Sequence, residues 1–152
     1  MRDGSRALRR VPALLLAAAL LIPSAGSTRA QHLSGPCDLH RWTDETVRHF
    51  SKRHIGCAVR SFGPVPGGKT RAICIAKRES GLIPDASSLT GDYLGLYQHA
   101  ADHWEDRYVT WTKKRWKLPD KAVSGRTNAV VTIRMVHGAG GWRKAGWPIT
   151  GC

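Results

Sequence analysis

The chain has 152 residues, and its 24 Lys and Arg against 11 Asp and Glu give a formal net charge of +13 at pH 7. With no internal repeat and no linker in residues 31–152, this length excludes a multidomain arrangement and suits one compact core. The charge attracts polyanions, but it specifies neither the polyanion nor a reaction.

The first 30 residues have the pattern of a signal peptide. An arginine-rich start is followed by residues 11–23, an apolar run rich in Leu and Ala. This run is too short to span a bilayer as a stable helix. Small residues allow cleavage after Gly26 or Ala30, and we favour the second. We therefore predict a signal peptide over 1–30 and a secreted domain over 31–152, without a membrane segment.

The first helix of the domain is expected to begin near Thr43. Thr43 has the position of an N-cap, and Trp42 and Val47 have the spacing of a hydrophobic staple. Val47 is expected to face the core. Gly56 is the expected end of this helix, and a Pro- and Gly-rich loop over residues 61–69 follows it.

A second helix is expected between Thr70 and Gly81. Thr70 can cap its start, and Gly81 supplies the left-handed residue that ends it. Glu79 then lies in the last turn, where the helix macrodipole disfavours an anion. The same field favours the protonated carboxyl group that a general acid needs. A residue that conflicts with its local position is a candidate functional group.

The remaining chain is predicted to be helical. Residues 101–112 have helical patterning, a break is expected near Pro119, and an apolar helix covers Asn128 to His137, ending at Gly138. The β-branched residues of this last segment also fit a strand, but its Gly-rich flanks favour a helix. We expect one compact all-α domain with at most a small hairpin.

Four cysteines in a short exported chain predict two disulfide bonds. They are Cys37, Cys57, Cys74 and Cys152. Their spacing does not choose among the three pairings. A zinc site is the competing interpretation, but the chain has no Cys-x-x-Cys, and the pair His99 and His103 lacks the Glu of a zinc protease motif. We expect no metal and no cofactor.

The segment from Glu79 to Gln98 carries a more specific pattern. Its matching residues are Glu79, Ser80, Gly81, Pro84, Ala86, Ser88, Gly91, Gly95, Leu96, Tyr97 and Gln98. The pattern resembles the catalytic core of the soluble lytic transglycosylase and goose-type lysozyme superfamily. It is most similar to the small secreted actinobacterial branch that includes the resuscitation-promoting factors. Three residues separate Gly91 from Gly95, as in that branch, instead of the commoner two.

The resemblance implies a lysozyme-like fold, a disulfide pairing and a set of site residues. Small domains of this kind tie the helix of the acid to a cysteine after a C-terminal Trp-Pro, which implies Cys74–Cys152 and leaves Cys37–Cys57. Glu79 would be the catalytic acid. The residues expected to bind substrate are Ser88, Tyr93, Gly95, Tyr97, Gln98 and Trp142. Their glycine, amide and aromatic groups suit a sugar chain.

The implied reaction is cleavage of the β-1,4 bond between N-acetylmuramic acid and N-acetylglucosamine in peptidoglycan. Glu79 would protonate the glycosidic oxygen and then deprotonate the muramoyl C6 hydroxyl, which gives a 1,6-anhydro product. Hydrolysis by water is the alternative, and Asp92 is its candidate second acid. A non-catalytic cationic wall-binding or antimicrobial protein is a further alternative.

The expected partners follow from the same resemblance. They are peptidoglycan glycan strands and, through the positive charge, anionic wall polymers. The chain is expected to be monomeric, extracellular or associated with the wall, and no nucleic acid partner is expected.

Overall fold

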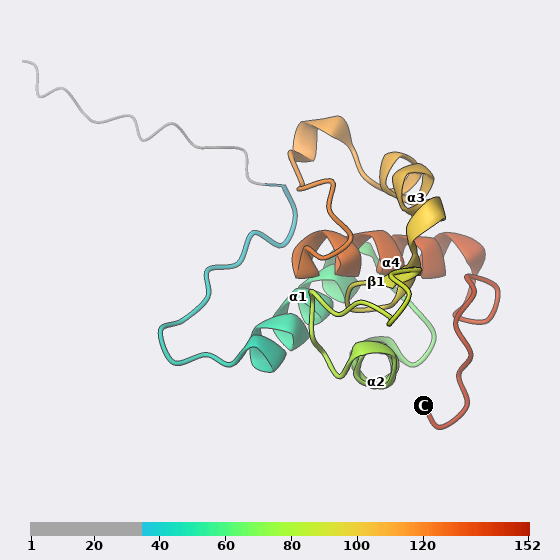
Figure 1. Ribbon diagram of the computed structural model, residues 1–152, viewed down its shortest axis with the longest axis horizontal. Coiled ribbons are helices and arrows are strands. Elements are labelled where there is room, and N and C mark those ends of the chain that lie inside the picture. Colours follow the sequence, from blue (N-terminus) through green and yellow to red (C-terminus); the bar gives the residue numbers. More distant parts are fainter. Residues whose placement is uncertain (1–34) are drawn as a thin grey trace, which may run out of the picture. The chain divides into compact units, whose positions relative to one another are not determined.

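The structure is a computed structural model that describes residues 35–152 (Figure 1). The elements of this part are α1 (Val47–Phe62), α2 (Gly68–Ser80), β1 (Tyr93–Leu94), β2 (His99–Ala100), η1 (Ala101–His103), α3 (Trp104–Trp111), η2 (Lys114–Trp116) and α4 (Gly125–Ala139). The fold is all-α with one small hairpin, so the predicted fold class is confirmed. The predicted signal peptide, 1–30, lies outside the described residues.

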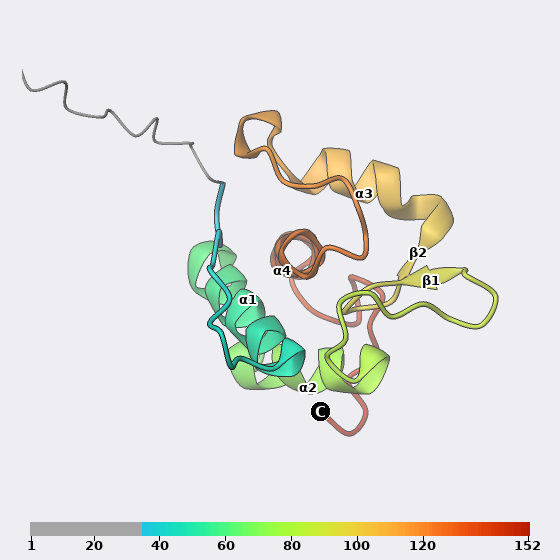
Figure 2. The ribbon, with the colours of Figure 1, turned by 60° about the vertical axis from the view of Figure 1, so that its left-hand side comes forward.

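Helix α4 is the central element of the described domain. Figure 2 shows it nearly end-on, with α1, α2, the hairpin and α3 arranged around it. Its fully buried apolar residues are Ala129, Val130, Val131, Ile133 and Val136. A helix surrounded by other elements buries most of its circumference, and this explains the apolar run over residues 129–136, although Asn128 and Thr132 are buried with it.

The start of α1 differs from its prediction. The hydroxyl of Thr46, three residues after Thr43, accepts a backbone N–H of the first turn, so the helix begins at Val47. The Val47 side chain is 37% exposed and does not face the core. Trp42 is 59% exposed, and the Arg53 guanidinium carbon lies 3.9 Å from the centroid of the Trp42 ring. Trp42 therefore packs against Arg53, and the predicted hydrophobic staple is wrong.

The other helix ends show which sequence signals are decisive. Helix α1 continues through Gly56 and ends at Gly63, because a lone glycine inside a helix costs only about 1 kcal/mol and packing offsets it. Helix α2 begins after Gly67, without a side-chain cap, so the predicted cap at Thr70 is wrong. Its predicted end is confirmed, since Gly81 has a left-handed φ of 65°. Helix α4 extends beyond its predicted range at both ends.

Two disulfide bonds tie the ends of the described chain to the helices. Cys37 bonds to Cys57 of α1, and Cys74 of α2 bonds to Cys152, with Cα atoms 5.6 Å and 5.7 Å apart. These are the pairs that the resemblance implied. Figure 1 shows the C-terminus beside α2 as a result. Disulfides of this kind are typical of proteins that fold in an oxidising compartment.

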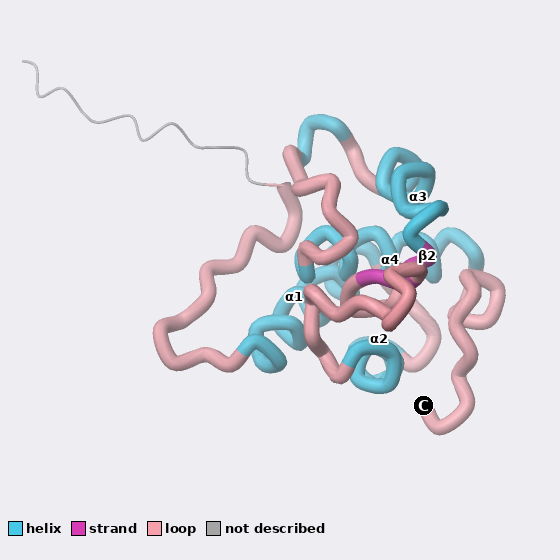
Figure 3. Tube along the Cα trace, in the orientation of Figure 1, coloured by secondary structure: helices cyan, strands magenta, loops and turns pink. Residues whose placement is uncertain are grey.

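Long stretches of the described chain are loops. Figure 3 shows them between α2 and the hairpin, before α4, and from the end of α4 to the C-terminus. Within the described residues, no helix combines the length and the apolar character needed to cross a bilayer.

Candidate active site

Glu79 lies in the last turn of α2 with its carboxyl group at the surface. The side chain is 23% exposed, and its Oε1 is 2.8 Å from Nη2 of Arg78. The guanidinium of Arg78 also donates to the carbonyl oxygens of Pro148 and Thr150, at 2.6 Å and 2.8 Å. Arg78 therefore supplies the positive charge that offsets the unfavourable helix end, and it places the C-terminal segment beside the candidate acid.

Ser80 joins the end of α2 to the hairpin. Its hydroxyl lies 3.1 Å from the carbonyl oxygen of Ala76 and 2.8 Å from that of Leu96, sixteen residues further along the chain. The second contact holds the hairpin turn against the residue that follows the acid. Sequence reasoning treated Ser80 only as part of a motif, because nothing local to it indicates a partner at Leu96.

The hairpin turn needs its glycine for packing. Tyr93 pairs with Ala100 and Leu94 with His99, and the turn between them begins at Gly95, with φ at 80°. A Cβ on Gly95 would overlap the side chain of Asn128 in α4. Gly95 is buried, and its small size allows the hairpin turn to pack against α4. Its contact with a substrate stays a prediction.

Gln98 and Ser88 hold the loop together. The Gln98 amide donates to the carbonyl oxygens of Ala86 at 3.3 Å and Gly95 at 2.9 Å. The Ser88 hydroxyl accepts the backbone N–H of Tyr93 at 3.1 Å. Both side chains remain partly exposed, so each is available to a ligand while it fixes the shape of the loop.

Two residues predicted to bind substrate are buried. The Tyr97 hydroxyl donates to the Ala72 carbonyl at 3.0 Å, and the Trp142 indole donates to the Pro66 carbonyl at 2.9 Å. Trp142 is 2% exposed and Tyr97 is not exposed at all. In this structure the two rings pack in the core, and their contact with a sugar stays a prediction.

Their rings instead form an aromatic cluster beneath the hairpin. Tyr97 lies 5.9 Å from Trp142 and 6.0 Å from Trp147, measured between ring centroids. The Trp147 indole donates to the Tyr97 carbonyl at 2.8 Å. Aromatic residues bury large apolar areas, and their polar atoms need a partner when buried, which these carbonyls supply.

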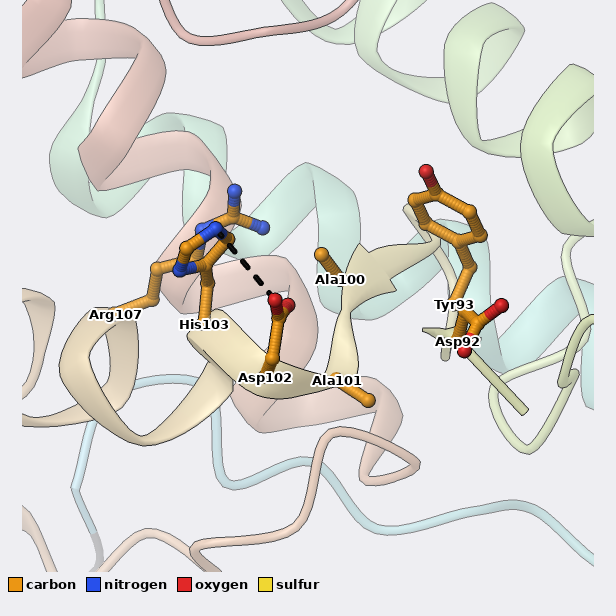
Figure 4. A pocket seen from close by; sticks show the side chains of 7 residues that line it. All are labelled: Asp92, Tyr93, Ala100, Ala101, Asp102, His103 and Arg107. Carbon is orange, nitrogen blue, oxygen red and sulfur yellow. Dashed lines mark ion pairs between the residues drawn. The ribbon is translucent and has the colours of Figure 1, made fainter. Parts of the chain in front are cut away.

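Asp92 and Tyr93 lie on the outer side of the hairpin. Both are exposed, Tyr93 by 51%. The Thr90 hydroxyl donates to a carboxylate oxygen of Asp92 at 2.6 Å. The two residues line a cavity of about 640 Å³, which Figure 4 shows, together with Ala100, Ala101, Asp102, His103 and Arg107. Glu79 is not among the residues that line this cavity.

His99 is a polar residue of the core that sequence reasoning missed. Its ring is fully buried, with Nε2 2.7 Å from the Thr132 hydroxyl and Nδ1 3.1 Å from the Arg107 guanidinium. Burial, with a smaller contribution from Arg107, lowers the pKa of His99 to about 3. The ring is therefore neutral at ordinary pH. A histidine between Gln98 and an alanine carries no local signal of these contacts.

Within the part of the chain that the structure describes, no three His, Cys, Asp or Glu side chains gather in a way that could hold a metal ion. Glu79 offers a partly exposed carboxyl group in the last turn of α2, and Arg78 joins this turn to the C-terminal segment. Comparison with known proteins adds no further assignment, since no family model, curated protein or solved structure matches the chain.

Proposed function

We propose that the chain is a secreted enzyme that cleaves peptidoglycan at the β-1,4 bond between N-acetylmuramic acid and N-acetylglucosamine. Glu79 acts as general acid and then as general base, and the product carries a 1,6-anhydro ring. The resemblance of the segment from Glu79 to Gln98 to the transglycosylase and goose-type lysozyme superfamily motivates this proposal.

One observation carries the proposal. The Glu79 carboxyl group lies at a helix end that the Ser80–Leu96 hydrogen bond fixes against the hairpin turn. It is 23% exposed, so a substrate can reach it, and Nη2 of Arg78, 2.8 Å from its Oε1, fixes its orientation while the other carboxyl oxygen is left to carry the proton. A general acid needs both access and a fixed direction toward the bond that breaks.

The proposed reaction needs one carboxyl group. Glu79 gives its proton to the glycosidic oxygen, the bond from that oxygen to C1 breaks, and an oxocarbenium-like centre develops at C1. The Glu79 carboxylate then takes the proton of the muramoyl C6 hydroxyl, whose oxygen bonds to C1. Glu79 ends protonated, ready for the next cycle, and no water is consumed.

The hydrolytic alternative depends on Asp92. A water nucleophile is usually guided by a second carboxylate across the scissile bond. Asp92 is exposed and accepts a hydrogen bond from Thr90, which suits a turn residue. This environment favours the anhydro route, in which Asp92 is neither acid nor base.

The test is incubation of the mature protein with purified peptidoglycan, followed by mass spectrometry of the released fragments. We expect fragments one water lighter than hydrolysed ones. Glu79→Gln should release none, whereas Glu105→Gln, which changes an exposed glutamate of α3, should match the wild type. Hydrolysed fragments would assign a lysozyme reaction, and no fragments from the wild type would refute the enzyme proposal.

A second candidate function is cationic binding to the wall without catalysis. The observation that favours it is an aromatic and basic surface at η2, where Arg134 and Lys113 lie 4.9 Å and 5.5 Å from the Trp116 ring centroid. The exposed cations beside them are Lys114, Arg115 and Lys117. This candidate predicts wall clearing that Glu79→Gln retains and that salt removes, since salt screens exposed charges.

A further inference from the structure

Arg107 is held by a neutral partner instead of a carboxylate. The Thr132 hydroxyl donates its only hydrogen to the Asn128 carbonyl at 2.8 Å, so it accepts from Nε2 of His99. Nδ1 of His99 then carries the lone pair, and Arg107 donates to it at 3.1 Å. One N–H of the guanidinium is thus fixed by a chain of hydrogen bonds that ends in α4.

This arrangement leaves Arg107 without a carboxylate in direct contact. The side chain is partly buried, and burial lowers its pKa while the more distant Asp102 raises it. Among the described residues, the ion pairs within 4.0 Å do not include Arg107. A partly buried guanidinium with a neutral neighbour is stabilised by an anion that brings its own charge.

The cavity beside Arg107 also offers negative groups. Figure 4 shows Arg107 and His103 at one side, Asp92 and Tyr93 at the other, and the small side chains of Ala100 and Ala101 between them. Asp102 lies on the Arg107 side, 3.9 Å from His103. A ligand with only negative charge is repelled by the carboxylates of Asp92 and Asp102. A ligand with a negative and a positive group can place the first on Arg107 and the second on a carboxylate.

We propose that this cavity binds the peptide stem of peptidoglycan through a carboxylate on Arg107, at one side, and an ammonium group on Asp92, at the other. Tyr93 covers the bound peptide with its exposed ring. The inference rests on the proposed function for the identity of the ligand, because wall peptides that end in a diamino acid carry both groups. Its cavity of about 640 Å³ accommodates a residue of that size.

The probe is a stem peptide that ends in diaminopimelate, free or attached to a glycan fragment, titrated by calorimetry into Glu79→Gln protein so that nothing is cleaved. We expect amidation of the carboxylates or acetylation of the amine to weaken binding about tenfold or more. Arg107→Gln should weaken binding of the free peptide by the same factor and leave binding of the amidated peptide unchanged. Arg115→Gln, which changes an exposed arginine of η2, is the matched control.

Equal affinity for the free peptide and for its amidated or acetylated forms would overturn the inference, and so would a lack of binding by all of them. Both results are obtained without any variant of Arg107. Cleavage of peptidoglycan by the wild type alongside that result would leave the proposed function standing. Binding of the peptide through Arg107 without any cleavage of peptidoglycan by the wild type would support the peptide-binding cavity and refute the proposed enzymatic function. If Arg107→Gln fails to fold, Arg107→Lys keeps the charge but loses the planar fork, and it should give an intermediate loss.

Discussion

The Ser80 hydroxyl lies 2.8 Å from the carbonyl oxygen of Leu96, and this contact joins the helix of the candidate acid to the hairpin turn. The same hydroxyl lies 3.1 Å from the Ala76 carbonyl one turn earlier in α2. The hydroxyl has one hydrogen for these two carbonyl oxygens, and the shorter contact ties the residue that follows Glu79 to the hairpin turn. The position of the Glu79 carboxyl group depends on this bond as well as on its own ion pair.

Ser80→Ala should therefore lower both stability and activity. Loss of the hydroxyl leaves the Leu96 carbonyl without this donor, which costs about 1 kcal/mol in the free energy of unfolding. The rate of peptidoglycan cleavage should fall by about tenfold or more, because small displacements of a catalytic group are costly. Urea unfolding and a rate assay measure the two effects. Thr110→Ala, an exposed position on α3, is the control, and an unchanged rate in Ser80→Ala would contradict the positioning role.

The two disulfides should contribute unequally. The Cys74–Cys152 bond spans 78 residues and the Cys37–Cys57 bond spans 20. By loop-closure entropy, removing the bond that closes the longer loop costs about 4.5 kcal/mol, and removing the bond that closes the shorter loop costs about 3 kcal/mol. Urea unfolding of the two double Cys→Ser variants compares these costs. Loss of the longer link should also lower activity more, since it releases the segment that Arg78 contacts. The reverse order in both measurements would contradict this account.

Stability should fall as the pH is lowered from 7 to 5. The folded-state pKa of His99 is about 3, below its unfolded value near 6.5, so the unfolded chain binds more protons between these values. The neutral His99 ring makes its full contribution to the free energy of unfolding above pH 6.5. At pH 5 this free energy is lower by about 2 kcal/mol. Burial also lowers the pKa of His54, to about 4, which adds to the same slope.

Urea unfolding at pH 7 and pH 5 measures this slope. His99→Gln should reduce the difference between the two pH values, because glutamine does not titrate, although the variant will be less stable at both. An unchanged difference in His99→Gln would show that this buried ring is not the source of the slope.

Asp92→Asn should be mild. Asp92 lies on the exposed outer side of the hairpin and accepts from Thr90, so it is a candidate turn residue more than a catalytic one. We expect kcat to stay within about threefold and the products to remain anhydro-muropeptides, since a required acid or base contributes about a hundredfold or more. The contact of Asp92 with a stem ammonium group acts on substrate binding, so its loss should raise KM and leave kcat nearly unchanged. A hundredfold loss together with hydrolysed products would make Asp92 the second acid of a lysozyme.

Local signals explain the parts of the fold that the sequence predicted. Gly81 ends α2 because a left-handed residue satisfies the last carbonyls of a helix, and this depends on nothing distant. The helix over the apolar run of α4 was likewise predicted from the residues of that run alone. The cap of α1 was misplaced because Thr43 and Thr46 have the same capping chemistry, and the choice between them depends on the contacts of Trp42 and Arg53.

The candidate site was predicted only where exposure follows from the local chain. Glu79 and Tyr93 are accessible, as expected of a helix end and a hairpin. The burial of Tyr97 and Trp142 could not be predicted, because an aromatic ring packs inward or outward according to the neighbouring elements, here α2 and the loop before it. The contacts of Arg78 and Arg107 could not be predicted, since their partners are distant in the chain or buried without any sequence signal.

The most direct test of the account is the rate at which Glu79→Gln cleaves a defined glycan, measured beside its affinity for the same glycan. We predict a loss of rate of at least about a thousandfold, with affinity within about threefold of the wild type and a thermal midpoint within a few degrees. The exposed ion pair with Arg78 contributes little to stability, so the fold should persist. Cleavage by Glu79→Gln at the wild-type rate would contradict the central claim that Glu79 is the catalytic acid.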